Sequence, residues 1–249
     1  MGSSPQRIYL FAGDSLTEGA QGESYVDRVA QALVEQGGAG TQVVNAGRSG
    51  DTIRSLLARI DEPIQRYQPD WVILAVGVND VWLPWLSDRS PGWWLGLQSR
   101  RLRGEPPPTR DLDQAAALYR TLIDRVHQAG ARPLVCTCSP LGEQITSPLN
   151  QQLARLNGII QRAAMDGGAP VADVWQAFVE TLALVEKPSR YLPGEWLFTW
   201  RDRRRLSQTS PDEISRRRRL LLTYDGLHLN SRGADLWAQT ILRALARWD

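Results

Sequence analysis

The order of hydrophobic and polar residues predicts strands that alternate with helices along the whole chain. Short apolar runs bounded by turn residues predict β-strands, which cover 7–12, 41–45, 71–76, 132–138 and 170–174. Between and after these runs, apolar residues recur every three or four positions, which predicts helices over 25–36, 51–64, 112–128, 149–165 and 231–248. The third strand, WVILAV, has no polar position, as is typical of a parallel strand covered on both faces.

This alternation predicts an α/β fold with a central parallel sheet of about five strands and helices on both faces. Right-handed crossovers between parallel strands limit the possible topologies to a few. The length of 249 residues fits one large domain, or at most two small ones.

Two long segments, 81–110 and 186–223, interrupt the alternation. They contain six of the ten tryptophans, namely Trp82, Trp85, Trp93, Trp94, Trp196 and Trp200. Disordered segments are poor in aromatic residues, so we expect ordered covers of the domain. Two interpretations of the tryptophans stay open: an apolar cover over a site, above all by Trp82, Trp85 and Trp196, or packing of the two segments onto the domain.

Composition excludes several classes of function. The formal net charge is only +2, so no overall field attracts nucleic acid or acidic lipid, and we expect neither partner. The arginine clusters 201–205 and 216–219 contain interspersed acidic residues and are interpreted as solvated faces, with an anionic ligand as the alternative. Cys136 and Cys138 lie two positions apart in an apolar run, which favours two buried thiols over a metal or redox pair.

No apolar stretch reaches the ~20 residues that span a bilayer, so we expect no membrane insertion. The first residues lack the pattern of a signal peptide, which predicts a cytoplasmic protein, unless a signal segment ahead of the chain has been removed.

The first candidate for chemistry is Ser15 in Gly13-Asp14-Ser15, directly after the first strand. Ligands of open parallel sheets bind beyond the carboxyl ends of the strands, where a serine can act as a nucleophile. Taken alone this is a weak signal, because glycine and serine are also common turn residues.

A base and its partner precede the last helix, in Asp225-Gly226-Leu227-His228. Histidine titrates in the range that a general base needs, and a carboxylate three residues away can hold its ring. The only other histidine, His127, lies near the end of a predicted helix, where it favours the negative end of the helix dipole.

Two further segments follow strands at the same edge of the sheet. Asn79 can offer its side-chain N–H to a developing oxyanion, or can form a simple turn with Asp80. The segment from Asn45 to Thr52 carries glycines whose backbone N–H groups could approach a reacting oxygen, or forms a capped start of a helix. Together, the four segments meet the requirements of an acyl-transfer site.

The sequence resembles the SGNH hydrolases, also called GDSL esterases and lipases. Four motifs of this family occur in order, GDSLTEG at 13–19, VVNAGRSGDT at 43–52, GVND at 77–80 and DGLHLN at 225–230. The nucleophile pattern differs from that of α/β-hydrolases, because position 17 is threonine where Gly-x-Ser-x-Gly needs glycine. The four motifs span most of the chain.

The resemblance implies a flavodoxin-like three-layer α/β/α sandwich made of one domain, 1–249, with insertions at 81–110 and 186–223. It implies Ser15 as the nucleophile, His228 as the base and Asp225 as the residue that orients it. The implied oxyanion hole consists of the Ser15 N–H, a glycine N–H and Asn79. Spacing favours Gly50 as that glycine, with Gly47 as the alternative.

The function expected from the resemblance is that of a serine esterase without metal or cofactor. Its substrate would be a small ester: a short-chain acyl ester, an acetylated carbohydrate, a lysophospholipid or a thioester. The alternative from a different class is a non-catalytic flavodoxin-like module that binds an anionic ligand at the same strand ends. Neither the oligomeric state nor the acyl length follows from the sequence.

Overall fold

The computed structural model describes residues 7–37, 40–192, 206 and 208–248. Its centre is a sheet of five parallel strands in the order β2-β1-β3-β4-β5. The strands are β1 (Arg7–Gly13), β2 (Thr41–Asn45), β3 (Trp71–Ala75), β4 (Arg132–Cys136) and β5 (Val171–Ala172). The predicted parallel α/β sheet is therefore confirmed.

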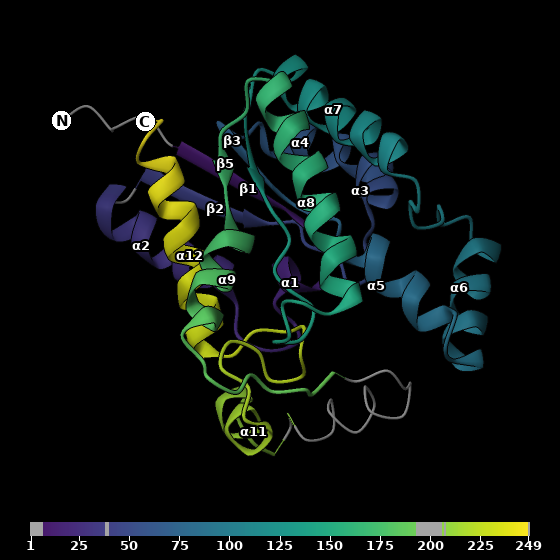
Figure 1. Cartoon of the computed structure of the whole chain (residues 1–249). Helices are drawn as coiled ribbons and strands as arrows, with labels where there is room; N and C mark the ends of the chain where they lie inside the picture. The colour runs from purple at the N-terminus through teal and green to yellow at the C-terminus, as the bar shows by residue number, and fades with distance from the viewer. Residues whose placement is uncertain (1–6, 38–39, 193–205, 207, 249) are drawn as a thin grey trace.

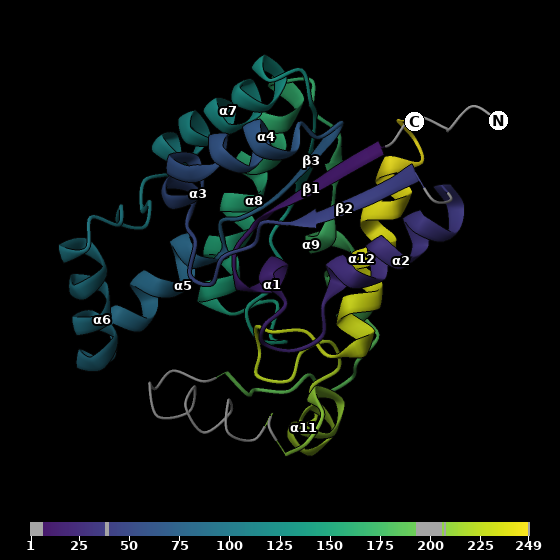
Figure 2. The ribbon, with the colours of Figure 1, turned by 180° about the vertical axis from the view of Figure 1, so that it is seen from behind.

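Helices cover both faces of the sheet and complete three layers (Figures 1 and 2). One layer consists of α2 (Tyr25–Gly37), α9 (Val174–Ala183) and α12 (Ser231–Leu245). The other consists of α3 (Ile53–Arg59), α4 (Asp61–Tyr67), α7 (Leu112–Gln128) and α8 (Pro148–Asp166). This is the α/β/α arrangement that the resemblance implies.

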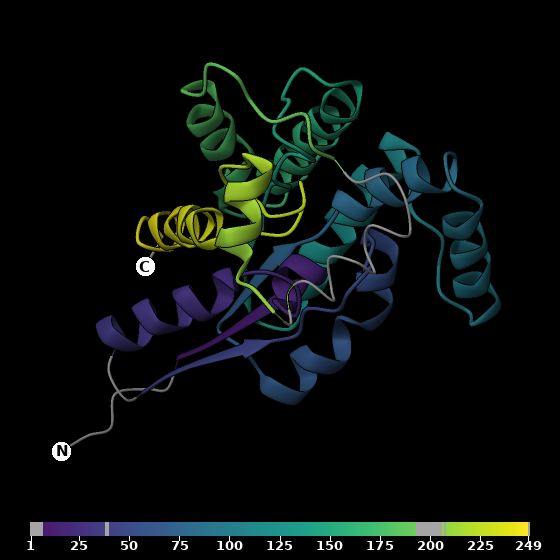
Figure 3. The ribbon, with the colours of Figure 1, turned by 90° about the horizontal axis from the view of Figure 1, so that it is seen from below.

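The remaining helices lie outside the two layers. Two of them follow strands directly, α1 (Ser15–Glu18) after β1 and α5 (Val78–Ser87) after β3. From α5 the chain continues into α6 (Pro91–Leu102), which packs on α5 at the periphery of the molecule (Figures 1 and 3). The last is α11 (Pro211–Arg218), ahead of the loop that leads to α12.

The core lies between the sheet and its two helical layers. All five residues of β3 are buried, as its unbroken apolar sequence predicts. Between α2, α9 and α12, the ring of Trp237 stacks on Tyr25 at 4.7 Å and meets Phe178 edge-on. Cys136 and Cys138 are free and buried, as expected.

The predicted helix 51–64 is wrong as a single element, because the structure has two short helices there. The first, α3, ends at Arg59, and α4 begins at Asp61. Pro63 has no N–H to donate to the carbonyl of Arg59, so a continuous helix would lose a hydrogen bond at this position.

Other boundaries also differ from the pattern. The fourth strand ends at Cys136 rather than at 138, where the N–H of Cys138 donates to Asn157 Oδ1 (2.8 Å). The fifth ends at Ala172 because Asp173 caps α9, a helix that the pattern leaves unassigned. The first long segment contains most of α5 and all of α6, so it is largely helical.

Candidate active site

The strand order turns at β1 and β3, which places the ends of these two strands beside each other. From β1 the chain moves outward to β2, and from β3 it moves to β4 in the opposite direction. Such a switch point leaves a crevice at the carboxyl ends of the strands. Ser15 follows β1 and Asn79 follows β3, so the two residues flank this crevice.

Local contacts fix the position of Ser15. Asp14 is the N-cap of α1 and accepts a hydrogen bond from the N–H of Leu16 (3.0 Å). Ser15 is the first helical residue, so its N–H has no partner within the helix. Gly13 has no room for a side chain, because a Cβ there would overlap with Thr17 and with the carbonyl of Ala75. The tight turn presents the Ser15 hydroxyl at the end of the sheet.

The predicted base and its partner meet Ser15 although they lie far away in the sequence. Nε2 of His228 lies 3.2 Å from the Oγ of Ser15. Its Nδ1 lies 2.7 Å from Oδ2 of Asp225. A carboxylate at Nδ1 favours the tautomer with the proton on that nitrogen, which leaves Nε2 free to accept the proton of the serine.

The carboxylate of Asp225 is held at both oxygens. Its Oδ1 accepts hydrogen bonds from the N–H groups of Leu227 (2.9 Å) and His228 (2.7 Å). Burial by itself raises the pKa of this group, but the charge and hydrogen bond of His228 and the two backbone donors outweigh burial. The pKa of Asp225 is therefore held below its ordinary value, and the group is ionised at neutral pH.

The loop that carries Asp225 and His228 is anchored from two directions. Glu143 accepts hydrogen bonds from the N–H groups of Leu221 and Leu222 (2.7 and 2.8 Å). At the other end of the loop, Asn230 caps α12 by accepting the N–H of Gly233 (3.0 Å). One end of the loop is thus fixed to the segment that follows β4, and the other end to α12. These anchors hold His228 next to Ser15.

The glycine segment after β2 lies on the other side of the serine. The N–H of Gly47 donates to Oδ1 of Asn45 (2.9 Å), and Gly47 packs against the backbone of α1. Gly50 has a φ of +80°, which glycine adopts without strain, and it lines the cavity at Ser15. The N–H of Gly47 already donates a hydrogen bond to Asn45, whereas Gly50 lines the cavity.

Asn79 connects this segment to β3. Its Nδ2 donates a hydrogen bond to the carbonyl of Asp51 (2.9 Å), and the residue lines the same cavity as Ser15. An amide nitrogen carries two N–H groups, so a second donor is left for an oxygen in the cavity.

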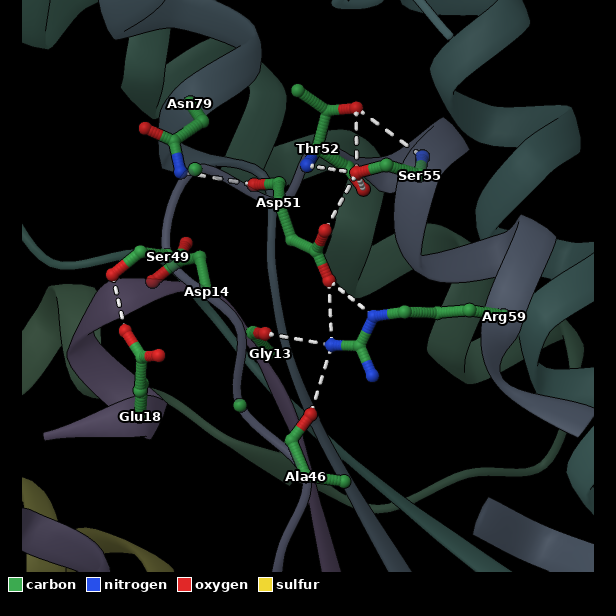
Figure 4. A network of polar contacts seen from close by, with 12 residues as sticks. Gly13, Asp14, Glu18, Ala46, Ser49, Asp51, Thr52, Ser55, Arg59 and Asn79 are labelled. Atoms are coloured by element: carbon green, nitrogen blue, oxygen red, sulfur yellow. Dashed lines mark hydrogen bonds and ion pairs between the residues drawn. The ribbon is translucent and has the colours of Figure 1, made fainter. Parts of the chain in front are cut away.

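Arg59 binds the glycine segment to the ends of β1 and β2 (Figure 4). Its guanidinium contacts the carboxylate of Asp51, with Nε 2.6 Å and Nη2 2.5 Å from Oδ2. The same Nη2 donates to the carbonyls of Ala46 (2.8 Å) and Gly13 (3.3 Å). Burial raises the pKa of Asp51 in spite of this partner. One side chain therefore holds three segments of the site together.

Two further carboxyl groups lie buried around the site. Asp80 accepts the N–H groups of Ile53 (2.9 Å) and Thr109 (2.6 Å), which fixes the start of α3 and the end of the first long segment. Burial raises the pKa of Asp80 to about 6. Burial also raises the pKa of Asp14, to about 7, although the N–H of Leu16 opposes the shift.

A cavity of about 230 Å³ opens at Ser15. It is lined by Ser15, Gln21, Ser49, Gly50, Asn79, Trp82, Leu83, Leu86, Trp93, Arg100, Asp225, Leu227 and His228. One wall, from α5 and α6, is mainly apolar, and the opposite side carries the polar groups described above. The cavity brings together all the predicted site residues that come from the four motifs.

The tryptophans of the long segments do not act as one group. Trp82 and Trp93 line the cavity at Ser15. Trp85 stacks on Trp82 at 5.1 Å but lines a second cavity, of about 430 Å³, between α5 and α8. Trp94 is 50% exposed and belongs to a third hollow beside α6. A cover formed by all six rings is therefore wrong for Trp85 and Trp94. Trp94 directly follows Trp93 on α6 and so faces another direction, and Trp85, although it stacks on Trp82, lines the second cavity.

Trp196, Trp200 and the arginines 201 and 203–205 lie outside the described residues. In the second arginine cluster, Arg216 and Arg217 pair with Glu213, and Arg218 donates to the carbonyl of Tyr224 (2.8 Å). His127 is in the last turn of α7, and its Nε2 lies 3.0 Å from the carbonyl of Gly167.

Within the part of the chain that the structure describes, no three acidic, histidine or cysteine residues form a group suited to a metal ion. Over the same residues, no helix combines the length and the apolar character that crossing a bilayer requires.

Several residues of the site do not stand out in the sequence. Arg59 and Arg100 reach it from helices, and Leu83 and Leu86 form part of its wall. Arg59 follows Asp51 by eight residues, about 12 Å along a helix, which is beyond the i,i+3 and i,i+4 contacts that a sequence can indicate. The pair forms because Asp51 lies ahead of α3. Arg100 has no sequence signal either, because it belongs to a segment whose course the pattern does not predict.

Known proteins resemble this chain in sequence and in fold. Residues 11–191 match the model of the GDSL-like lipase/acylhydrolase family. An acetylxylan esterase from Geobacillus stearothermophilus is 38% identical over 99 residues, which cover 32% of this chain. The match spans only 44% of the length of that relative.

Solved structures resemble the whole fold at low sequence identity. An acetylxylan esterase from Geobacillus stearothermophilus has a TM-score of 0.67 at 21% identity, with 98% of this chain and 96% of that chain covered. The enzyme LAE5 from the metagenome of Lake Arreo has a TM-score of 0.66 at 20% identity, with 99% and 98% covered. The family match covers well over half of the sequence, and the chain therefore belongs to the GDSL-like lipase/acylhydrolase family of ester hydrolases.

Proposed function

We propose that the protein hydrolyses carboxylic esters through an acyl-enzyme on Ser15. The observation that carries this proposal is the continuous chain of contacts from the Ser15 Oγ through both nitrogens of His228 to the carboxylate of Asp225. A hydroxyl next to a histidine whose other nitrogen is held by a carboxylate is the arrangement that activates a serine as a nucleophile.

In the first half of the reaction, Nε2 of His228 takes the proton of Ser15 while the Oγ forms a bond to the acyl carbon. The carbonyl oxygen then carries negative charge, for which the N–H of Ser15, the N–H of Gly50 and the second N–H of Asn79 Nδ2 are the proposed donors. The tetrahedral intermediate collapses as the ester C–O bond breaks, and His228 passes its proton to the leaving alcohol oxygen.

In the second half, water replaces the alcohol. His228 takes a proton from the water, whose oxygen attacks the acyl carbon on Ser15. The bond to the Oγ breaks, His228 returns the proton to the serine, and the carboxylic acid leaves. Asp225 stays ionised throughout and stabilises the protonated ring, in agreement with the lowered pKa of its carboxyl group.

We propose an acetylated carbohydrate as the substrate, among the small esters considered above. A volume of about 230 Å³ is below the usual range of sites for drug-sized ligands, so it suits a short acyl group better than a fatty chain. The wall next to Ser15 contains Trp82 and Trp93, whose ring faces suit contact with a sugar. The partial match to an acetylxylan esterase supports the same choice.

An acyl-length series tests this proposal. We expect kcat/KM on p-nitrophenyl esters to be highest for acetate and to fall at least about tenfold by octanoate, since even one methylene for which the cavity has no room costs ~1–3 kcal/mol. Acetylated xylo-oligosaccharides should release acetate, and Ser15→Ala provides the background rate. A rate that rises with chain length would contradict the substrate proposal and would favour a lipid ester.

A further inference from the structure

Arg100 is the one described residue of α6's last turn that reaches the cavity at Ser15. Its Nη2 donates a hydrogen bond to the carbonyl of Gly50 (2.8 Å). Its Nε donates to Oε2 of Glu105 (2.7 Å), and the N–H of Glu105 donates back to the carbonyl of Arg100 (3.1 Å). The Arg100 side chain is only 20% exposed, so this contact is shielded from bulk water.

Gly50 needs such a contact more than other residues of its loop. A glycine at φ +80° has no side chain to anchor it, and it rotates more freely than any other residue. The neighbouring Asp51 is held at its carboxylate by Arg59 and at its carbonyl by Asn79. For the carbonyl of Gly50, Arg100 supplies the corresponding hydrogen bond.

The fit between Arg100 and this loop is close. A Cβ added to Gly50 would lie 2.6 Å from Nη1 of Arg100, which is closer than real contacts allow. The guanidinium therefore packs directly on the glycine backbone as well as bonding to it. Two residues of α6 line the cavity at Ser15, Trp93 and Arg100, and Arg100 is the one that hydrogen-bonds to the glycine segment.

We propose that Arg100 is a positioning residue for the oxyanion hole. By holding the carbonyl of Gly50, it fixes the ψ angle of this glycine and so the orientation of the preceding peptide, whose N–H is that of Gly50 and points at the developing oxyanion. Through this contact, α6 contributes to the rate of acyl transfer. This inference rests on the proposed function, in which Gly50 is an oxyanion donor. It assigns to the first long segment a task beyond covering the site.

Steady-state kinetics of two matched variants test the proposal. Arg100→Met removes the bond to Gly50, and Arg103→Met is the control, because Arg103 pairs with the same Glu105 but is 59% exposed and does not line the cavity. We expect kcat on p-nitrophenyl acetate to fall about tenfold in Arg100→Met, with KM within about twofold, since misplacing a donor weakens binding of the transition state only. Arg103→Met should stay within about twofold of wild type.

Two more measurements separate positioning from a purely structural role. Arg100→Lys keeps a cationic donor but cannot contact Gly50 and Glu105 with two nitrogens, so its kcat should lie between those of Arg100→Met and wild type. Hydrogen exchange of the Gly50 and Asp51 amides should accelerate in Arg100→Met and not in Arg103→Met. Hydrogen exchange does not depend on esterase activity. If wild type shows no esterase activity, the proposed function fails, but the exchange rates still show whether Arg100 holds Gly50 in place.

The proposal is overturned by unchanged kcat and unchanged exchange in Arg100→Met. Equal losses in both variants would also overturn it, because they would indicate general destabilisation of α6. A rise in KM without loss of kcat would assign Arg100 to substrate binding in place of positioning.

Discussion

Asp225 shows how the site is set at the scale of single residues. One carboxylate oxygen faces the ring of His228 and the other accepts two backbone N–H groups, so the group cannot rotate without breaking three hydrogen bonds. The residue is 8% exposed, which keeps water from competing for these bonds. The orientation of the histidine therefore depends on the chemistry of this one carboxylate.

Asp225→Asn should lower kcat by about 10³–10⁴-fold with little change in KM. An amide N–H facing Nδ1 would favour the tautomer with the proton on Nε2, which then cannot accept the proton of Ser15. The control is Asp235→Asn on α12, an exposed carboxylate that pairs with Arg28. An Asp225→Asn protein that folds and keeps more than a tenth of wild-type kcat would refute the role of Asp225.

The sequence predicts single residues well where chemistry and short spacing coincide. Asp225 and His228 lie three positions apart in a motif, and Ser15 follows a clear strand, so all three could be selected. Arg100 lies 50 positions from its partner Gly50, and nothing in the local pattern connects the two. A contact of this kind follows from tertiary packing, which residue types and periodicity do not encode.

At the scale of elements, α1 is a helix of four residues whose N-cap, Asp14, is a buried acid. Asp14 caps this helix, yet burial raises the pKa of its carboxyl group to about 7, above the ordinary 3.8. Between these two pH values the folded protein retains a proton that the unfolded chain has lost. The contribution of Asp14 to stability therefore falls as the pH rises through this window.

Asp14→Asn keeps an acceptor for the N–H of Leu16 but cannot ionise. We expect its melting temperature, relative to wild type, to increase between pH 4.5 and pH 8, with a gain in unfolding free energy of up to about 4 kcal/mol. Asp111→Asn, at the exposed N-cap of α7, controls for the loss of a capping carboxylate. If the difference between Asp14→Asn and wild type is the same at both pH values, the raised pKa is wrong.

Elements with strong periodicity were predictable, and interrupted ones were not. The first three strands and the helices α2, α7, α8 and α12 follow their patterns closely. The break between α3 and α4 depends on a single proline, and α5 with α6 occupies a segment with tryptophans but no regular apolar repeat. The segments that form the wall of the cavity are therefore the ones whose apolar pattern is least regular.

At the scale of the whole molecule, topology brings distant residues into contact. Ser15 and His228 are 213 positions apart, and they meet because Ser15 follows the interior strand β1 and the loop ahead of α12 passes over the same end of the sheet. The four motifs predicted this convergence. Three of them follow strands at the same edge of the sheet, and the fourth directly precedes the last helix. The volume and the walls of the cavity were not predictable, because they depend on how α5 and α6 fold.

Covalent labelling of Ser15 tests the central claim most directly. Wild-type protein treated with a p-nitrophenyl alkylphosphonate should gain one phosphonyl group, with one p-nitrophenol released, and peptide mass spectrometry should locate it on Ser15. Ser49→Ala, which removes the other serine of the cavity, should still be labelled, and Ser15→Ala should not. Labelling that persists in Ser15→Ala, or that is absent from a folded wild-type protein, would contradict the account.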